Sequence, residues 1–381
     1  MQTDGNKALE TAKKLMDDFA RRTGLTGDER ALERRYLWTD AFAVQTFFGL
    51  AHSLQEEPYR QQALDLIGHV HGKLGRHRRE DERTGWISGL PEQEGKMHPT
   101  AGGLRIGKRL PEREADEIYN EALEWERDGQ YFHYITRWIN ALLEAHEETA
   151  EQRYADWAAE LVQAGGKFID RSGSRLRMHW KMSIDLSRPL VPSMGAHDPL
   201  EGLICALSAQ QAAPQRAEEL EPLVKDFKQL CAGNDWATTD ALGIGGLLLN
   251  TGRSVALAAT AEALPQEITP QALLQDSLQG LRVYEQTFRP SRSAHQRLAF
   301  RECGLSLGLR TLTGMKEYVG DTGLDVSELE RYTPLAEAIE DFWAKPEHQS
   351  SPTWTEHLDI NAVTLAASLV ANRYPRAFCA L

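Results

Sequence analysis

The chain has 381 residues, of which 41% are hydrophobic and 26% are charged, and its formal net charge at pH 7 is −13. This composition is typical of a globular protein, and the acidic residues along both halves offer no basic stripe for a nucleic acid. No run approaches the roughly 20 apolar residues that cross a bilayer, so no membrane partner is predicted. Residues 1–10 are polar and lack the apolar core of a secretory signal, which predicts a cytoplasmic protein.

Helical patterns of two kinds alternate along the chain. Six stretches carry small or apolar residues almost all the way round, at 37–54, 131–147, 200–212, 239–257, 297–312 and 360–371. Each follows a more polar stretch with one apolar stripe, roughly at 6–22, 60–77, 152–169, 218–231, 271–287 and 327–343. A helix that is apolar all round is buried on all sides, whereas an amphipathic helix lies between core and solvent. The order predicts an all-α fold, an (α/α)6 toroid of six helical hairpins, as a single domain over residues 1–381.

Two long stretches interrupt this rhythm. Residues 78–127 include the glycine-rich segment 98–107 and are too long for a simple connection, which predicts a lid-like insertion. Residues 170–197 alternate apolar side chains with basic ones, the period of a half-exposed strand, which predicts a short β-hairpin or extended arm. Both precede an inner helix, so both are expected on the face of the toroid where the inner helices begin.

The run 241–249 carries Gly243, Gly245 and Gly246. A glycine in a helix costs roughly 1 kcal/mol relative to alanine, so three glycines require a packing reason. Close approach of neighbouring inner helices would supply that reason. A buried strand is the alternative interpretation, because short apolar runs are ambiguous by periodicity alone.

Neither a metal nor a cofactor is predicted from the sequence. The four cysteines, Cys205, Cys231, Cys303 and Cys379, stand far apart and in no metal-binding spacing. No HExxH motif occurs, and the glycine-rich segment lacks the preceding strand and the GK[ST] of a phosphate-binding loop. The cysteines are therefore expected to pack as small apolar side chains.

Carboxylates recur near the starts of the predicted inner helices. Those inside apolar segments are Asp40, Glu201, Asp240, Glu302 and Asp359. A charge there costs free energy unless it faces a wet cavity or a partner, so these five are functional candidates. The alternative is a buried ion pair with Arg137, Arg297 or Arg301. Helix capping is the preferred interpretation of three further aspartates, Asp128, Asp198 and Asp235.

Aromatic and imidazole side chains recur at the same helix starts. An indole offers a flat apolar plane and one N–H, which suits stacking on a sugar, and the candidates are Trp38, Trp86, Trp180, Trp236 and Trp354. A neutral imidazole is a natural proton shuttle, and the candidates are His98, His133, His197, His295 and His357. Core packing or a structural role is the alternative for each residue taken alone.

The hairpin count, the small-residue inner helices and the starts rich in aromatic and acidic residues resemble the six-hairpin glycosidase-like superfamily. That superfamily includes glycoside hydrolases, unsaturated uronyl hydrolases and the N-acylglucosamine 2-epimerase group. The segments 37–42 (LWTDAF) and 47–52 (FFGLAH) are similar in style to the first inner helix of the epimerase group. That group usually carries an arginine near this helix start, where this chain has Asp40, Ala41 and Phe42. The resemblance therefore implies a carbohydrate-active enzyme, with hydrolysis ahead of epimerisation.

Three hypotheses for function follow, and the first is glycoside hydrolysis of a small sugar or oligosaccharide by an Asp/Glu pair. Asp40 and Glu302 are its predicted acid–base pair, His197 or His357 would position the sugar, and Trp38, Trp236 and Trp354 would form a stacking wall. The other predicted binding residues are His98, Tyr131, His133, Glu201, Asp240, Arg301 and Asp359. The second hypothesis is a sugar epimerase or isomerase with histidine bases. The third is a noncatalytic helical toroid that binds a peptide or protein.

Overall fold

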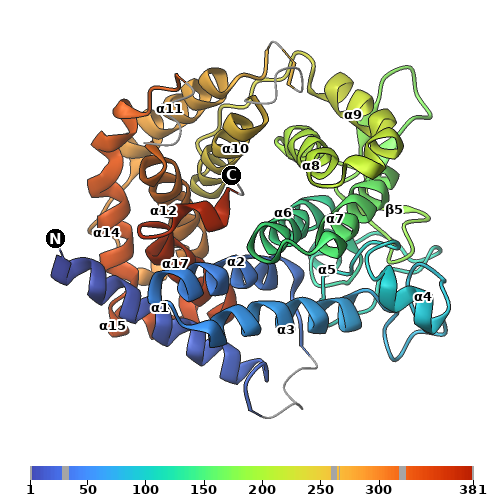
Figure 1. Cartoon of the computed structure of the whole chain (residues 1–381), viewed down its shortest axis with the longest axis horizontal. Helices are drawn as coiled ribbons and strands as arrows, with labels where there is room; N and C mark the ends of the chain where they lie inside the picture. The colour runs from blue at the N-terminus through green and yellow to red at the C-terminus, as the bar shows by residue number, and fades with distance from the viewer. Residues whose placement is uncertain (1, 28–33, 259–263, 266, 317–322, 380–381) are drawn as a thin grey trace. The chain divides into compact units, whose positions relative to one another are not determined.

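In the computed structural model, residues 2–27, 34–258, 264–265, 267–316 and 323–379 are described (Figure 1). The chain divides into two compact units. Unit 1 comprises residues 1–22, 42–63 and 233–381, and unit 2 comprises residues 23–41 and 64–232. The division falls inside two continuous helices, α2 (Leu37–Leu54) and α3 (Glu57–Leu74), so each of them supplies residues to both units.

Unit 1 contains buried and amphipathic helices in alternation. Its long helices besides α2 and α3 are α1 (Gln2–Arg22), α10 (Ala241–Ala258), α11 (Pro270–Thr287), α12 (Ala299–Gly314), α14 (Thr333–Trp343) and α17 (Leu358–Ala371). Short elements connect them: η4 (Ala294–Gln296), η5 (Ser327–Tyr332), α15 (Pro346–Gln349), α16 (Pro352–Thr355) and η6 (Pro375–Phe378). Nearly every side chain of α12 and α17 is buried, whereas α1, α11 and α14 each expose one face. The predicted inner and outer classes are therefore confirmed in this unit.

Glycines allow α10 and α12 to pack backbone to backbone. A Cβ on Gly245 would lie 2.1 Å from the carbonyl oxygen of Gly304, and a Cβ on Gly308 would lie 2.5 Å from that of Gly245. The predicted close approach of inner helices is confirmed, and the alternative of a buried strand is wrong. α10 is also long and apolar enough to cross a membrane, with a mean hydropathy of 1.2, but 72% of it is buried in the structure. Its place between α11 and α12 accounts for this composition.

The inner helices of unit 1 run parallel. Phe300 N donates to Asn361 Oδ1 at 3.0 Å near the starts of α12 and α17, and Ser368 Oγ donates to Ser306 Oγ at 2.8 Å further along both helices. Contacts between α10 and α12 also show a parallel arrangement, because residues later in α10 meet residues later in α12. The starts of these helices therefore lie at one end of unit 1.

Unit 2 repeats this plan. Its long helices besides α2 and α3 are α6 (Phe132–Thr149), α7 (Gln152–Gly165), α8 (Asp198–Ala212) and α9 (Ala217–Cys231). The 3-10 segments η2 (Gly166–Phe168) and η3 (Pro214–Arg216) follow α7 and α8. The first turns of α6 and α8 meet through Thr136 and Glu201, and Cys205 contacts Asn140 one turn further along both helices. These two buried helices therefore also run parallel, with their starts side by side.

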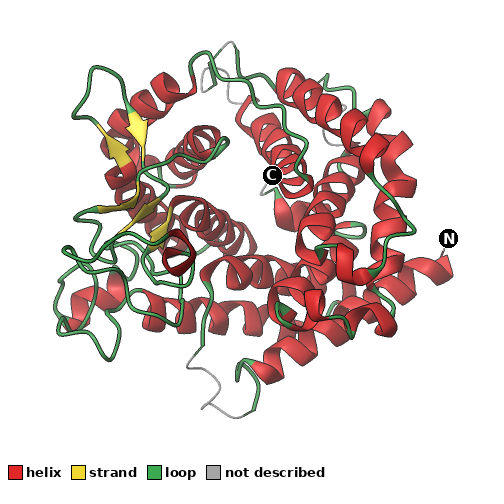
Figure 2. Cartoon of the chain, turned by 180° about the vertical axis from the view of Figure 1, so that it is seen from behind, coloured by secondary structure: helices red, strands yellow, loops and turns green. Residues whose placement is uncertain are grey.

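Among the described residues, every β-strand belongs to unit 2 (Figure 2). β2 (Ile169–Asp170) pairs antiparallel with β3 (Arg177–Met178). β4 (Lys181–Met182) pairs with β1 (Gln130–Tyr131) on one side and with β5 (Pro189–Val191) on the other. The predicted hairpin or arm at 170–197 is confirmed, and β1 attaches it to the start of α6.

The insertion at 78–127 is mostly loop, with two short helices, α4 (Glu92–Met97) and α5 (Glu121–Glu124). Asp128 anchors it from a fully buried position, because its carboxylate pairs with Arg105 and with Arg78 at 3.1 Å. It also accepts the backbone N–H groups of Gly107 and Lys108. Asp128 thus fixes a loop and caps no helix, and the role of the insertion as a lid stays a prediction.

Candidate functional site

The carboxylates predicted in unit 1 are paired with arginines. Glu302 is 8% exposed, pairs with Arg297 at 2.7 Å and accepts the indole N–H of Trp343 at 2.8 Å. Asp240 pairs with Arg301 at the starts of α10 and α12. The ion pairs considered as alternatives for Glu302 and Asp240 are therefore present. Asp359 is held differently, by Arg22 of α1 at 2.8 Å.

The aromatic candidates of unit 1 are buried. Trp354 is 1% exposed and stacks on Trp343 with ring centroids 5.7 Å apart, and Trp236 is also buried. His357 and His295 are exposed. Core packing therefore accounts for both tryptophans, as the alternative interpretation expected.

Three candidates of unit 2 take separate positions. Asp40 is 2% exposed, accepts the backbone N–H of Tyr36 at 3.1 Å and pairs with Arg35 at 3.4 Å. Trp38 is buried, and His98 contacts Glu160 of α7 at 2.5 Å. Asp40 belongs to unit 2 and Glu302 to unit 1, so their pairing stays a prediction.

Four other candidates of unit 2, Tyr131, His133, His197 and Glu201, gather where α6 and α8 begin. We name this place the α6–α8 site and define it by Tyr131, His133, Arg137, Trp180, His197, Asp198 and Glu201. The sheet brings Trp180 there, because β1 pairs with β4 in the register Tyr131 to Lys181. Phe132 N then donates to Trp180 O at 3.2 Å.

The aromatic half of the site is built on Trp180. Its ring centroid lies 5.7 Å from that of Tyr131 and 5.8 Å from that of His133. Its indole Nε1 donates to His133 Nδ1 at 3.0 Å, so the proton of a neutral imidazole is on Nε2. Burial lowers the pKa of His133 to about 4. At pH 7 His133 is therefore a neutral hydrogen-bond donor and not a base.

The charged half of the site centres on Glu201, which is 5% exposed. It pairs with Arg137 and accepts the hydroxyl of Thr136 at 2.8 Å. Burial opposes ionisation, but Arg137 and the Thr136 hydroxyl outweigh it and lower the pKa of Glu201. Arg137 Nη1 is buried and has no hydrogen-bond partner in the part of the chain that the structure describes. One guanidinium nitrogen of Arg137 is thus enclosed without a hydrogen-bond acceptor among the described residues.

Asp198 opens α8, one helical turn before Glu201. It is 4% exposed, and its Oδ2 accepts the backbone N–H of Gly195 at 2.9 Å. Burial and the neighbouring Glu201 raise the pKa of Asp198 to about 7. The site thus holds an ionised carboxylate beside a carboxyl group that keeps its proton near neutral pH. Environments that separate two carboxyl pKa values in this way are typical of acid–base pairs.

Part of this site lay outside the predicted set. Arg137 follows His133 by four residues on α6, which places both on one helix face. Trp180 stands in the alternating stretch before α8; it was one of the five stacking candidates, but the predicted stacking wall left it out. Asp198 was assigned first to capping, and the hydrogen bond from Gly195 N agrees with a local structural role. Its raised pKa depends on burial and on Glu201, which its sequence position alone does not show.

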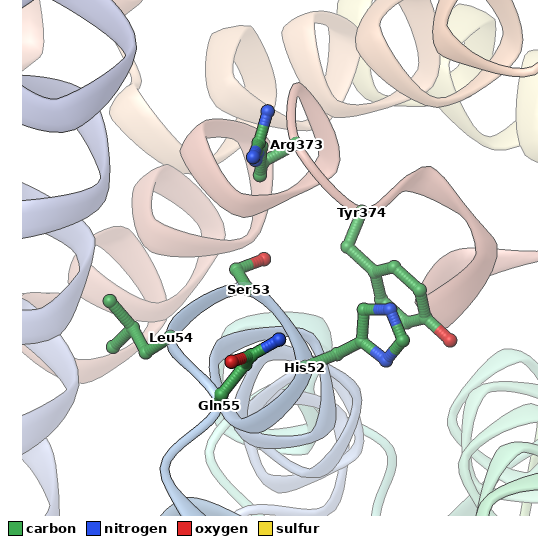
Figure 3. Close-up of a pocket in the computed structure, with 6 residues that line it drawn as sticks. All are labelled: His52, Ser53, Leu54, Gln55, Arg373 and Tyr374. Carbon is green, nitrogen blue, oxygen red and sulfur yellow. The ribbon is translucent and has the colours of Figure 1, made fainter.

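Unit 1 holds a separate cavity of about 490 Å³ beside the ends of α2 and α17 (Figure 3). None of the predicted site residues lines it. His52 stacks on Tyr374 there with ring centroids 3.9 Å apart, and Arg373 lies just beyond the last turn of α17. Basic side chains at helix C-termini are favoured by the helix dipole, which gives this lining a structural explanation. The α6–α8 site is therefore the stronger functional candidate.

Two solved structures resemble this chain over almost its whole length. The first is an inactive variant of the α-1,6-mannanase GH76A of Salegentibacter sp. HEL1_6 in complex with α-1,6-mannotetrose. Its TM-score is 0.56 at 11% identity, and the match covers 97% of this chain and 99% of that chain. The second is a polysaccharide lyase, with a TM-score of 0.50, 10% identity and coverage of 97% and 98%. No protein-family model and no curated protein matches the chain. The likeness confirms the predicted fold class, the all-α (α/α)6 type.

The mannanase variant carries alanine in place of two consecutive aspartates. Consecutive aspartates occur once in this chain, at Asp17 and Asp18 in α1. Asp17 accepts the hydroxyl of Tyr59 at 2.8 Å, and Asp18 pairs with Arg21 at 2.8 Å. The two consecutive aspartates of this chain thus lie in the amphipathic helix α1 and not at the start of an inner helix.

Proposed function

We propose that this protein is a carbohydrate-active enzyme that hydrolyses glycosidic bonds at the α6–α8 site. One observation carries the proposal. Asp198 and Glu201, one helical turn apart, have pKa values shifted in opposite directions, and His133, which accepts the indole N–H of Trp180, is close enough to Glu201 to act on its pKa. The fold shared with a mannanase and a polysaccharide lyase supports it.

The chemistry follows from these two protonation states. Glycoside hydrolysis needs a carboxylic acid that protonates the leaving oxygen and a carboxylate that activates water or attacks the sugar. In this proposal Asp198 is the acid and Glu201 is the carboxylate. The Nε2–H of His133 donates a hydrogen bond to a sugar oxygen, while Trp180 packs against the apolar face of the ring.

His133 does not suit the base of the epimerase alternative, because its Nδ1 accepts the Trp180 N–H and its pKa is lowered. His197 of the same site stays a predicted base for that alternative. The predicted pair of Asp40 and Glu302 stays a competing assignment for hydrolysis. Asp40 and Glu302 each pair with an arginine of their own unit, as Glu201 does with Arg137, so these ion pairs do not decide between the two assignments.

The test is release of reducing sugar from a panel of α- and β-linked oligosaccharides. We expect Asp198→Asn and Glu201→Gln to reduce kcat by about 10²-fold or more, the scale of a lost general acid or base. Asp40→Asn and Glu302→Gln are the matched comparison, and melting of all four variants by circular dichroism separates loss of chemistry from loss of fold. Loss of activity in the second pair alone would move the reaction to those residues, and a wild type inactive on every substrate would contradict the proposal.

A further inference from the structure

Large apolar side chains are exposed in the insertion just before β1. The exposed fraction is 88% for Ile118, 49% for Tyr119 and 42% for Trp125. Exposed apolar patches of this kind mark binding surfaces more often than they serve stability. The insertion thus presents aromatic side chains that the folding of unit 2 does not require to be buried.

Two of these side chains, Tyr119 and Trp125, border a small cavity of about 100 Å³. Four aromatic rings line it, those of Tyr119, Trp125, Tyr131 and Trp180. The indole of Trp125 meets that of Trp180 at 81° with centroids 4.9 Å apart, and the Tyr131 ring lies 6.2 Å from Trp125. Two nearly perpendicular indoles form the walls of a corner, which suits the apolar face of a sugar ring.

The cavity adjoins the α6–α8 site, because Tyr131 and Trp180 belong to both. Trp180 reaches His133 through its N–H and Trp125 through its ring. A sugar unit in the cavity would therefore meet Trp180, whose indole N–H bonds His133 of the α6–α8 site.

The acidic residues around the cavity bear on whether a neutral or an acidic sugar would bind there. Residues 112–126 contain seven acidic residues and one arginine, and two of the acidic residues, Glu112 and Glu117, pair with Arg83 and Arg127. Glu124 is neutralised by Lys181 and Arg113, each at 2.9 Å. Glu121 also lines the cavity and has no ion pair in the part of the chain that the structure describes. Like charges repel at short range, so this wall disfavours a sugar carboxylate while Glu121 and Ser193 can bond sugar hydroxyls.

We infer that this cavity is a second sugar subsite, and that the substrate is a neutral oligosaccharide of two or more units and not a polyuronate. The inference rests on the proposed function, since it extends the same site. Trp125 is its main binding residue and is supplied by the insertion.

The test is isothermal titration of the full chain with mannose, mannotetraose, maltotetraose and tetragalacturonate. In the wild type we expect a neutral tetrasaccharide to bind more tightly than the monosaccharide and than tetragalacturonate. Trp125→Ala should weaken tetrasaccharide binding about tenfold, a loss of one stacking contact, and should leave monosaccharide binding unchanged. Trp125→Phe, which keeps an aromatic ring, should restore part of the affinity.

The matched control is Leu123→Ala, which removes a 40% exposed side chain from α5, the short helix that Trp125 caps, without touching the cavity. Wild-type tetrasaccharide affinity in Trp125→Ala, or equal binding of tetragalacturonate, would overturn the subsite while the proposed function stands. Failure of every saccharide to bind the wild type would overturn both.

Discussion

Asp198 differs from three other buried carboxylates of this protein because no arginine forms an ion pair with it among the described residues. Glu201, Glu302 and Glu340 each pair with an arginine closely enough to form charged hydrogen bonds. In the part of the chain that the structure describes, Asp198 has no such ion pair and accepts a backbone N–H instead. A buried carboxyl without a cation keeps its proton to higher pH, so this residue responds to pH in the neutral range.

Substitution of Asp198 should change how stability depends on pH. The carboxyl has a folded-state pKa of about 7, against about 3.9 for an unfolded aspartate. The folded chain therefore binds more protons between these values, and its free energy of unfolding falls as pH rises through them. Asp198→Asn keeps an acceptor for Gly195 N but cannot ionise. We expect this variant to lose less stability than the wild type between about pH 5 and pH 8, by a difference on the order of 3 kcal/mol.

Urea denaturation at the two pH values measures this difference. Glu201 titrates in both proteins, so its opposite contribution largely cancels in the comparison. Parallel pH dependence in wild type and variant would show that Asp198 is not protonated in the folded state.

At the level of single residues, the sequence located the site only in part. Tyr131, His133, His197 and Glu201 could be predicted, because they stand where an apolar helix begins. Asp198 and Arg137 could not be predicted as functional residues. The raised pKa of Asp198 and the missing partner of Arg137 Nη1 among the described residues depend on burial by parts of the chain that are distant in sequence. Asp240 and Glu302 stood in positions equivalent to that of Glu201, and all three pair with arginines, so the ion pairs alone do not single out Glu201.

At the level of helices, the distribution of small and apolar residues decides which elements are buried. α2 begins and ends where its apolar pattern does, and α8, α12 and α17 deviate from prediction by about one turn or less. Helical periodicity is local, so these elements could be predicted from the sequence. The extra strand β1 could not, because a two-residue strand depends on its partner β4 and has no periodicity of its own.

The contact between α10 and α12 should be sensitive to a single methyl group. Gly245→Ala would place a Cβ 2.1 Å from a backbone oxygen of α12, and backbone cannot move aside cheaply. We expect a loss of about 2 to 3 kcal/mol in the free energy of unfolding, the usual scale of overpacking. Gly68→Ala in α3 is the control, because its Cβ would meet no atom within 4 Å.

The control should be neutral or stabilising by up to about 1 kcal/mol, as helix propensity predicts. Chemical denaturation of both variants provides the comparison. Equal stability of Gly245→Ala and the wild type would mean that the two helices can separate without cost.

At the level of the whole molecule, the two units share continuous helices. The division falls between residues 41 and 42 in α2 and between residues 63 and 64 in α3. Neither unit can unfold alone without breaking backbone hydrogen bonds of these helices. If the chain is a single domain, as predicted, the two units should therefore unfold together.

We expect one cooperative thermal transition, with equal calorimetric and van't Hoff enthalpies. Differential scanning calorimetry measures both quantities. Two resolved transitions, or a van't Hoff enthalpy near half the calorimetric value, would show that the units melt independently.

The four cysteines have a practical consequence for studying this protein. All are buried thiols outside disulfides, and burial raises the pKa of Cys231 to about 12 and that of Cys303 well above its usual value. Thiol reagents attack the thiolate, so the native chain should be almost inert to them. A cysteine introduced at exposed Ile118 would then carry a fluorescent label alone, and its emission would report directly when a sugar reaches the insertion.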